Sequence, residues 1–188
     1  MRKIYDFFSK LPKWYGICII IIYSIVTAEY ISTLSQFMLA QFEDVPQIVS
    51  LFFYFGYIAA ILISVVIWII YSYLFYLTAL VLGGNGSFEK VLNTSAYTFI
   101  LPSLCIFIAI ILLDGIDTQK MEDFQEFYLK NERFKNINLF VDLAFVPYYI
   151  LNVIIIHHAL KINWWYSIIS VFGPIIAMMG LSKLFQLI

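Results

Sequence analysis

The chain has 188 residues, of which 63% are hydrophobic and only 12% are charged, and its mean hydropathy is +0.91. A soluble domain carries about 25% charged residues and cannot hide this much apolar surface in its core, so we predict an integral membrane protein. The net charge of −1 argues against nucleic acid as a partner.

Five apolar stretches predict an all-α fold, a polytopic five-transmembrane-helix bundle that forms one membrane domain over residues 1–188. A bilayer core about 30 Å thick requires roughly 20 apolar residues of helix. The second stretch would make about 52 Å of helix, which is too long for one upright span and too short for a hairpin of two spans. One long tilted span and a span with an interfacial helix both fit this stretch. The spans are expected at residues 14–34, 48–82, 91–113, 139–160 and 164–188.

Basic residues in short loops predict the orientation of the chain. Four basic residues precede the first span, whereas the loop after it holds Glu43 and Asp44 and no base. This distribution predicts a cytoplasmic N-terminus and, with five spans, a C-terminus outside. A cleaved signal peptide is the rival interpretation, because Val26-Thr27-Ala28 resembles a cleavage site. The apolar pattern continues to Leu34 and favours an uncleaved span. The N-terminal segment 1–13 holds four basic residues, Arg2, Lys3, Lys10 and Lys13.

A polar turn, Gly83-Gly84-Asn85-Gly86-Ser87, separates the second and third spans. A phosphate loop would end in a Lys-Ser/Thr pair behind a strand, whereas Lys90 lies between two membrane helices. We therefore interpret the turn as a helix stop and restart, in which glycines accept positive φ and Ser87 or Asn85 caps the next helix. An anionic lipid headgroup at this helix N-terminus is the alternative. Its contacts would be Gly84, Gly86, Ser87 and Lys90.

Prolines and charges inside the apolar spans are the other candidates for function. Proline removes a backbone hydrogen bond and tends to bend a helix, and Pro102, Pro147 and Pro174 lie in the last three spans. Charge within a bilayer is costly, and a helical rise of about 1.5 Å per residue places three charges at similar height in the outer leaflet. They either reach the headgroups separately or form an ionic cluster joining three spans. These residues are Glu29, Asp142 and Lys183.

The remaining reactive residues have structural interpretations. His157 and His158 are adjacent on a helix, point about 100° apart and cannot share a metal as an i, i+4 pair does. Cys18 and Cys105 lie in apolar runs and are interpreted as small buried hydrophobic residues. Because the chain contains no nucleophile–base pair and no His-Glu-x-x-His motif, we expect no catalytic residue, cofactor or metal site.

The outer loop 114–138 contains apolar residues at helical spacing among acidic ones. Met121, Phe124 and Phe134 belong to this pattern, which predicts an amphipathic helix over residues 117–134. Such a helix would rest on the outer interface or bind an external partner.

The glycine-rich turn and its flanks carry a family resemblance. The run Leu80-Val81-Leu82-Gly83-Gly84-Asn85-Gly86-Ser87-Phe88 follows a long aromatic-rich span, and Ala96-Tyr97 and Pro102 come after it. This pattern resembles the Ypt-interacting protein (Yip) family of polytopic membrane proteins, most clearly over residues 65–104. The resemblance implies a five-span helical bundle with a cytoplasmic N-terminus.

The resemblance also implies a class of function. Eukaryotic relatives look like partners of prenylated Rab-type GTPases, and some bacterial-type relatives look like companions of ATP-driven exporters. This chain has Leu11-Pro12-Lys13-Trp14-Tyr15-Gly16 where eukaryotic relatives carry Asp-Leu-Tyr-Gly-Pro, so GTPase binding is not implied.

We therefore expect a bacterial-type member of the family, a non-enzymatic accessory or scaffold protein of a bacterial inner-membrane complex. Its expected partners are membrane lipids and other membrane proteins, with subunits of an ABC-type exporter and further copies of the chain both open. The alternatives are a small transporter or channel that uses the buried charges and a lipid-binding or membrane-shaping protein.

Overall fold

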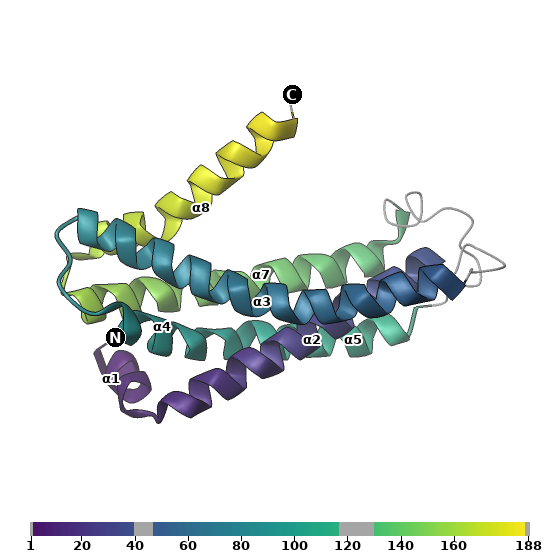
Figure 1. Ribbon diagram of the computed structural model, residues 1–188, viewed down its shortest axis with the longest axis horizontal. Helices are drawn as coiled ribbons and strands as arrows, with labels where there is room; N and C mark the ends of the chain where they lie inside the picture. Colours follow the sequence, from purple (N-terminus) through teal and green to yellow (C-terminus); the bar gives the residue numbers. More distant parts are fainter. Residues whose placement is uncertain (1, 40–46, 117–129, 187–188) are drawn as a thin grey trace. The chain divides into compact units, whose positions relative to one another are not determined.

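The computed structural model describes residues 2–39, 47–116 and 130–186, which are helical apart from short turns and contain no strand. The all-helical fold class is thereby confirmed. Figure 1 labels the helices. Their bounds are α1 Arg2–Lys10, α2 Lys13–Leu39, α3 Gln47–Val81, α4 Phe88–Ala96, the 3₁₀ turn η1 Tyr97–Phe99, α5 Ile100–Asp114, α7 Glu132–Leu160 and α8 Trp164–Gln186.

Four helical segments in the described residues are long and apolar enough to cross a membrane, and a fifth apolar segment is shorter. The four are Lys13–Leu39, Leu51–Val81, Phe88–Asp114 and Glu132–Leu160, and the shorter one is Trp164–Gly180. This agrees with the apolar stretches expected from the sequence and makes the chain a multi-pass membrane protein.

The second stretch forms one continuous helix, α3, of 35 residues. It contains no proline, so nothing removes a backbone hydrogen bond along its length. A hairpin of two spans is thus excluded, as expected from the length of the stretch.

Several bounds differ from the prediction: α2 continues to Leu39 rather than ending at residue 34, and α4 begins at Phe88 rather than at residue 91. α7 begins at Glu132 rather than residue 139, because the polar residues ahead of its apolar part continue the helix. The segment 1–13 contains a helix, α1, that was not predicted. The predicted amphipathic helix over residues 117–134 falls mainly on residues 117–129, which lie outside the described residues.

The described chain divides into two compact units. The first unit comprises Met1–Ile20, Ile67–Phe99 and Pro147–Ile188, and the second comprises Ile21–Val66 and Ile100–Val146. The single membrane domain expected over residues 1–188 stays a prediction.

The core of the first unit is built around the C-terminal half of α7. Ile156 and Leu160 are fully buried there, and they pack with Phe75 of α3 and Val91 of α4. Tyr5 of α1 joins the same cluster with 7% of its surface exposed. Because lipid tails are as apolar as these side chains, close packing rather than removal from water holds such helices together. Tyr5 therefore anchors α1 on this unit.

The backbone structure around the three prolines differs. Pro147 and Pro174 lie inside α7 and α8, which continue as α-helices on both sides of them. Pro102 follows the 3₁₀ turn η1, where the α-helical pattern is interrupted between α4 and α5. Short 3₁₀ pieces tighten a helix where regular hydrogen bonding is lost, which fits a proline in the following turn.

Candidate functional site

The glycine-rich turn ends α3 with a Schellman arrangement. Gly83 has a φ of +89°, a conformation that glycine adopts without strain. The amide of Gly84 donates to the carbonyl of Ala79 at 2.8 Å, and the amide of Gly83 donates to the carbonyl of Leu80 at 3.0 Å. The helix stop predicted at these glycines is confirmed.

Gly84 and Gly86 make close backbone approaches. A Cβ on Gly84 would lie 2.7 Å from the carbonyl oxygen of Ala79, and one on Gly86 would lie 2.6 Å from that of Ala159. Between them, the amide of Asn85 donates to the carbonyl of Leu160 at 2.8 Å. These residues fasten the turn to α3 and to the end of α7, and neither Gly84 nor Gly86 lines the pocket described below.

Ser87 occupies the N-cap position of α4, as the sequence predicted, with φ of −101° and ψ of 142°. Its side chain makes no capping hydrogen bond, however. The predicted position is therefore right and the predicted bond is wrong, so the hydroxyl of Ser87 is not used for capping.

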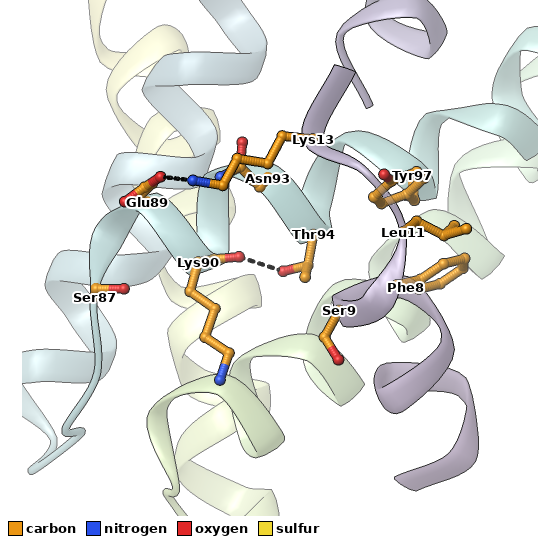
Figure 2. A pocket seen from close by; sticks show the side chains of 10 residues that line it. All are labelled: Phe8, Ser9, Leu11, Lys13, Ser87, Glu89, Lys90, Asn93, Thr94 and Tyr97. Carbon is orange, nitrogen blue, oxygen red and sulfur yellow. Dashed lines mark hydrogen bonds and ion pairs between the residues drawn. The ribbon is translucent and has the colours of Figure 1, made fainter. Parts of the chain in front are cut away.

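A pocket of about 190 Å³ lies in the first unit between α1, the start of α2 and α4. We call it the N-terminal pocket. Figure 2 shows Phe8, Leu11 and Tyr97 on one side of it and Ser87, Glu89 and Lys90 on the other. Ser87 and Lys90, two of the four residues predicted to contact a lipid headgroup, line it. The apolar side consists of Phe8, Leu11 and Tyr97, and the other lining residues are Ser9, Lys13, Ser87, Glu89, Lys90, Asn93 and Thr94.

Aromatic contacts fix the apolar side of the N-terminal pocket. The rings of Phe8 and Tyr97 stack with centroids 5.4 Å apart and planes only 3° apart. The hydroxyl of Tyr97 also donates to the carbonyl of Pro12 at 2.8 Å. Because Tyr97 is buried, it holds both the end of α1 and the α1–α2 connection against η1.

The polar side of the N-terminal pocket carries a net positive charge. Lys13 forms an exposed ion pair with Glu89. Lys90 forms no ion pair with any residue that the structure describes, and its ammonium lies 5.5 Å from the ring centroid of Tyr5. The hydroxyl of Thr94 donates to the carbonyl of Lys90 at 2.7 Å. Two ammonium groups and one carboxylate leave a surplus of one positive charge.

The chemistry that this lining offers is anion binding. Ammonium and hydroxyl groups are hydrogen-bond donors, and charge-assisted bonds to an anion are roughly twice as strong as neutral ones. No group of three or more metal-ligating side chains occurs among the described residues.

A polar network that was not predicted from the sequence joins α3, α4, η1 and α7. The hydroxyls of Ser72 and Ser95 lie 2.8 Å apart, and the indole of Trp68 donates to Ser95 at 3.2 Å. The amide of Asn152 donates to the hydroxyl of Thr98 at 3.1 Å. Such bonds hold membrane helices together. The sequence does contain one indication of this network, because Asn152 is an uncharged amide in the middle of an apolar span.

The predicted ionic cluster is divided between the two units. Glu29 and Asp142 belong to the second unit, on α2 and α7, and Lys183 belongs to the first, in the last turn of α8. The cluster stays a prediction.

The histidines and cysteines have structural surroundings. The ring of His157 stacks on Trp164 with centroids 4.1 Å apart, and the ring of His158 lies 5.6 Å from that of Tyr5. Both cysteines are free thiols, but Cys18 is exposed on its unit. The predicted burial of Cys18 is wrong, because its position on α2 turns it away from the packed face.

Residues 5–184 match the family model described as the Yip1 domain, which covers nearly the whole chain. No curated protein and no solved structure matches the chain. All residues that line the N-terminal pocket fall within the matched range.

Proposed function

The chain belongs to the Yip1 domain family, and from this premise we propose that it is a non-enzymatic membrane protein that acts by binding. Its role would be that of an accessory or scaffold subunit of a membrane complex, with an ATP-driven exporter as the favoured partner. The N-terminal pocket carries the proposal, because it offers ammonium, hydroxyl and aromatic contacts and includes no paired nucleophile and base.

Exposed apolar helix faces support a role in binding. In the first unit, Trp165, Ile176 and Met179 on α8 are 74%, 67% and 61% exposed. In a bilayer such faces meet either lipid or the spans of another protein. They supply the area that a subunit of a membrane complex needs outside the N-terminal pocket.

We place the protein in the bacterial inner membrane with its N-terminus in the cytoplasm and its C-terminus outside. The basic residues of α1 and the start of α2 support this orientation through the positive-inside rule. Alkaline phosphatase fused after residue 188 should be active, and green fluorescent protein fused there should not fluoresce. The reverse pair of results would contradict the orientation.

Co-purification in mild detergent tests the proposed function. The tagged protein should retain a reproducible set of membrane proteins that includes ATPase and permease subunits. Leu11→Trp, which places a larger side chain in the N-terminal pocket, should reduce this set. The control is Ile17→Trp, which adds the same ring at a position that is 51% exposed near the start of α2. A protein that always elutes alone would overturn the proposal.

A further inference from the structure

We propose that the N-terminal pocket binds the phosphate group of an anionic phospholipid from the adjacent leaflet of the bilayer. This inference rests on the proposed function, because it names the ligand class of the site on which that function depends. Four properties of the site lead to it: charge, free donors, size and position.

The charge of the N-terminal pocket matches a phosphate. Lys13 and Lys90 bring two ammonium groups to its lining, and Glu89 compensates one of them. Lys90 is free of ion pairs within the described part of the chain, so its ammonium is available to an incoming anion. A phosphate accepts several charge-assisted hydrogen bonds at once. In the lining, the ammonium of Lys90 and the hydroxyl of Ser87 can donate to it, whereas the hydroxyls of Ser9 and Thr94 already donate to backbone carbonyls of their own helices.

Free donors lie on the same side of the pocket as Lys90. The hydroxyl of Ser87 is not engaged in capping α4, and Figure 2 shows Ser87 and Lys90 both on the polar side. The first-turn amides of a helix are favourable to anions. Ser87 precedes the first turn of α4, in which Glu89 and Lys90 line the pocket.

The size of the N-terminal pocket fits a headgroup. Pockets for drug-sized ligands measure about 300–1,000 Å³, and this one measures about 190 Å³. It would therefore enclose a phosphate and part of its glycerol, with the rest of the lipid outside. Phe8 and Leu11 on the apolar side would contact the first carbons next to the phosphate.

The position of the pocket favours a lipid as the source of the phosphate. Two apolar segments begin beside it, at Lys13 and at Phe88. Trp14 and Tyr15 at the start of α2 are 57% and 42% exposed. Tryptophan and tyrosine are enriched at the level of the headgroups, so the pocket would lie where phospholipid phosphates are concentrated.

Native mass spectrometry of the purified full chain tests the inference. Phosphatidylglycerol and phosphatidylcholine would be offered in equal amounts in neutral detergent. The wild type should prefer phosphatidylglycerol about tenfold. In Lys90→Gln this preference should be about five times smaller, because roughly one charge–charge interaction is removed. Lys90→Arg should keep the preference, which shows that the loss comes from charge rather than from misfolding. Lys10→Gln is the control, since Lys10 is an exposed base outside the pocket lining.

Competition separates the two sources of phosphate. Millimolar glycerol 3-phosphate or inorganic phosphate should leave bound phosphatidylglycerol in place. Displacement by either would overturn the assignment to a lipid, and equal losses in Lys90→Gln and Lys10→Gln would overturn the assignment to the pocket. A protein that selects phosphatidylglycerol yet elutes without partners contradicts only the proposed function. Co-purified partners without lipid selectivity contradict only this inference.

Discussion

Each unit contains a cavity, and the two cavities have similar size and opposite chemistry. The N-terminal pocket of the first unit measures about 190 Å³, and a cavity between α2 and α3 in the second unit measures about 230 Å³. We call the latter the α2–α3 cavity. Three charged residues line the first, whereas the second is lined by apolar side chains, Ser32, Ser35 and Tyr57. The hydroxyl of Ser35 donates to the carbonyl of Ile31 in its own helix, so it offers little to a ligand.

Charge rather than volume therefore distinguishes the lining of the N-terminal pocket from that of the α2–α3 cavity. An apolar cavity among membrane helices suits a hydrocarbon chain, and such contacts do not distinguish one lipid headgroup from another. A cavity with an unpaired ammonium discriminates between anionic and neutral headgroups. The predictions below compare the two units in backbone packing, in buried hydrogen bonds and in charge.

The largest expected effect concerns two glycines, one next to each cavity. Gly86→Ala would bring a Cβ within 2.6 Å of the carbonyl oxygen of Ala159, and such overpacking should lower the free energy of unfolding by about 1–3 kcal/mol. Gly56 lines the α2–α3 cavity, and a Cβ there meets nothing within 4 Å. Gly56→Ala should therefore be neutral or stabilise α3 by up to about 1 kcal/mol. Thermal unfolding in detergent measures both variants, and equal destabilisation would contradict the account.

Buried hydrogen bonds should show a smaller difference in the same direction. Asn152→Leu removes two hydrogen bonds in the first unit, to the hydroxyl of Thr98 and to the carbonyl of Tyr148. It should destabilise the protein by up to about 1.7 kcal/mol. Tyr30→Phe removes the hydrogen bond to Asn138 in the second unit and should cost about 0.6 kcal/mol. Denaturation in mixed micelles would measure both, and a larger loss for Tyr30→Phe would reverse the expected order.

The smallest effect on stability, and a gain in binding, is expected for Glu89→Gln. Because the Lys13–Glu89 ion pair is exposed, its loss should leave the unfolding temperature nearly unchanged. The pocket lining would gain one net positive charge, and its affinity for phosphatidylglycerol should rise about two- to fivefold. Glu132→Gln removes another exposed acid, from the second unit, and should change neither quantity. A fall in affinity for Glu89→Gln would show that the carboxylate helps to form the site.

Local signals in the sequence located the long apolar helices but not α1. The continuous apolar runs predicted the first described residues of α3 and α8 to within one residue, and Gly83–Gly84 predicted the end of α3. The start of α7 was misplaced because its first residues are polar, and hydropathy alone does not show that a helix continues beyond the bilayer.

The N-terminal pocket could not be predicted, because contacts between distant residues form it. Phe8 stacks on Tyr97, and Lys13 pairs with a carboxylate 76 positions away. Ser87 and Lys90 were predicted from the local turn, whereas the opposite side of the pocket depends on α1 folding back against α4 and η1. The polar network was missed for a similar reason, since Ser72 and Ser95 are unremarkable until their helices meet.

Photocrosslinking at one position in each cavity tests the central claim most directly. A benzophenone amino acid would replace Leu11 in the N-terminal pocket or Phe52 in the α2–α3 cavity, and the captured lipids would be identified after irradiation of intact membranes. The account predicts enrichment of anionic phospholipid at position 11 and capture in proportion to membrane composition at position 52. The same lipid composition at both positions would contradict it.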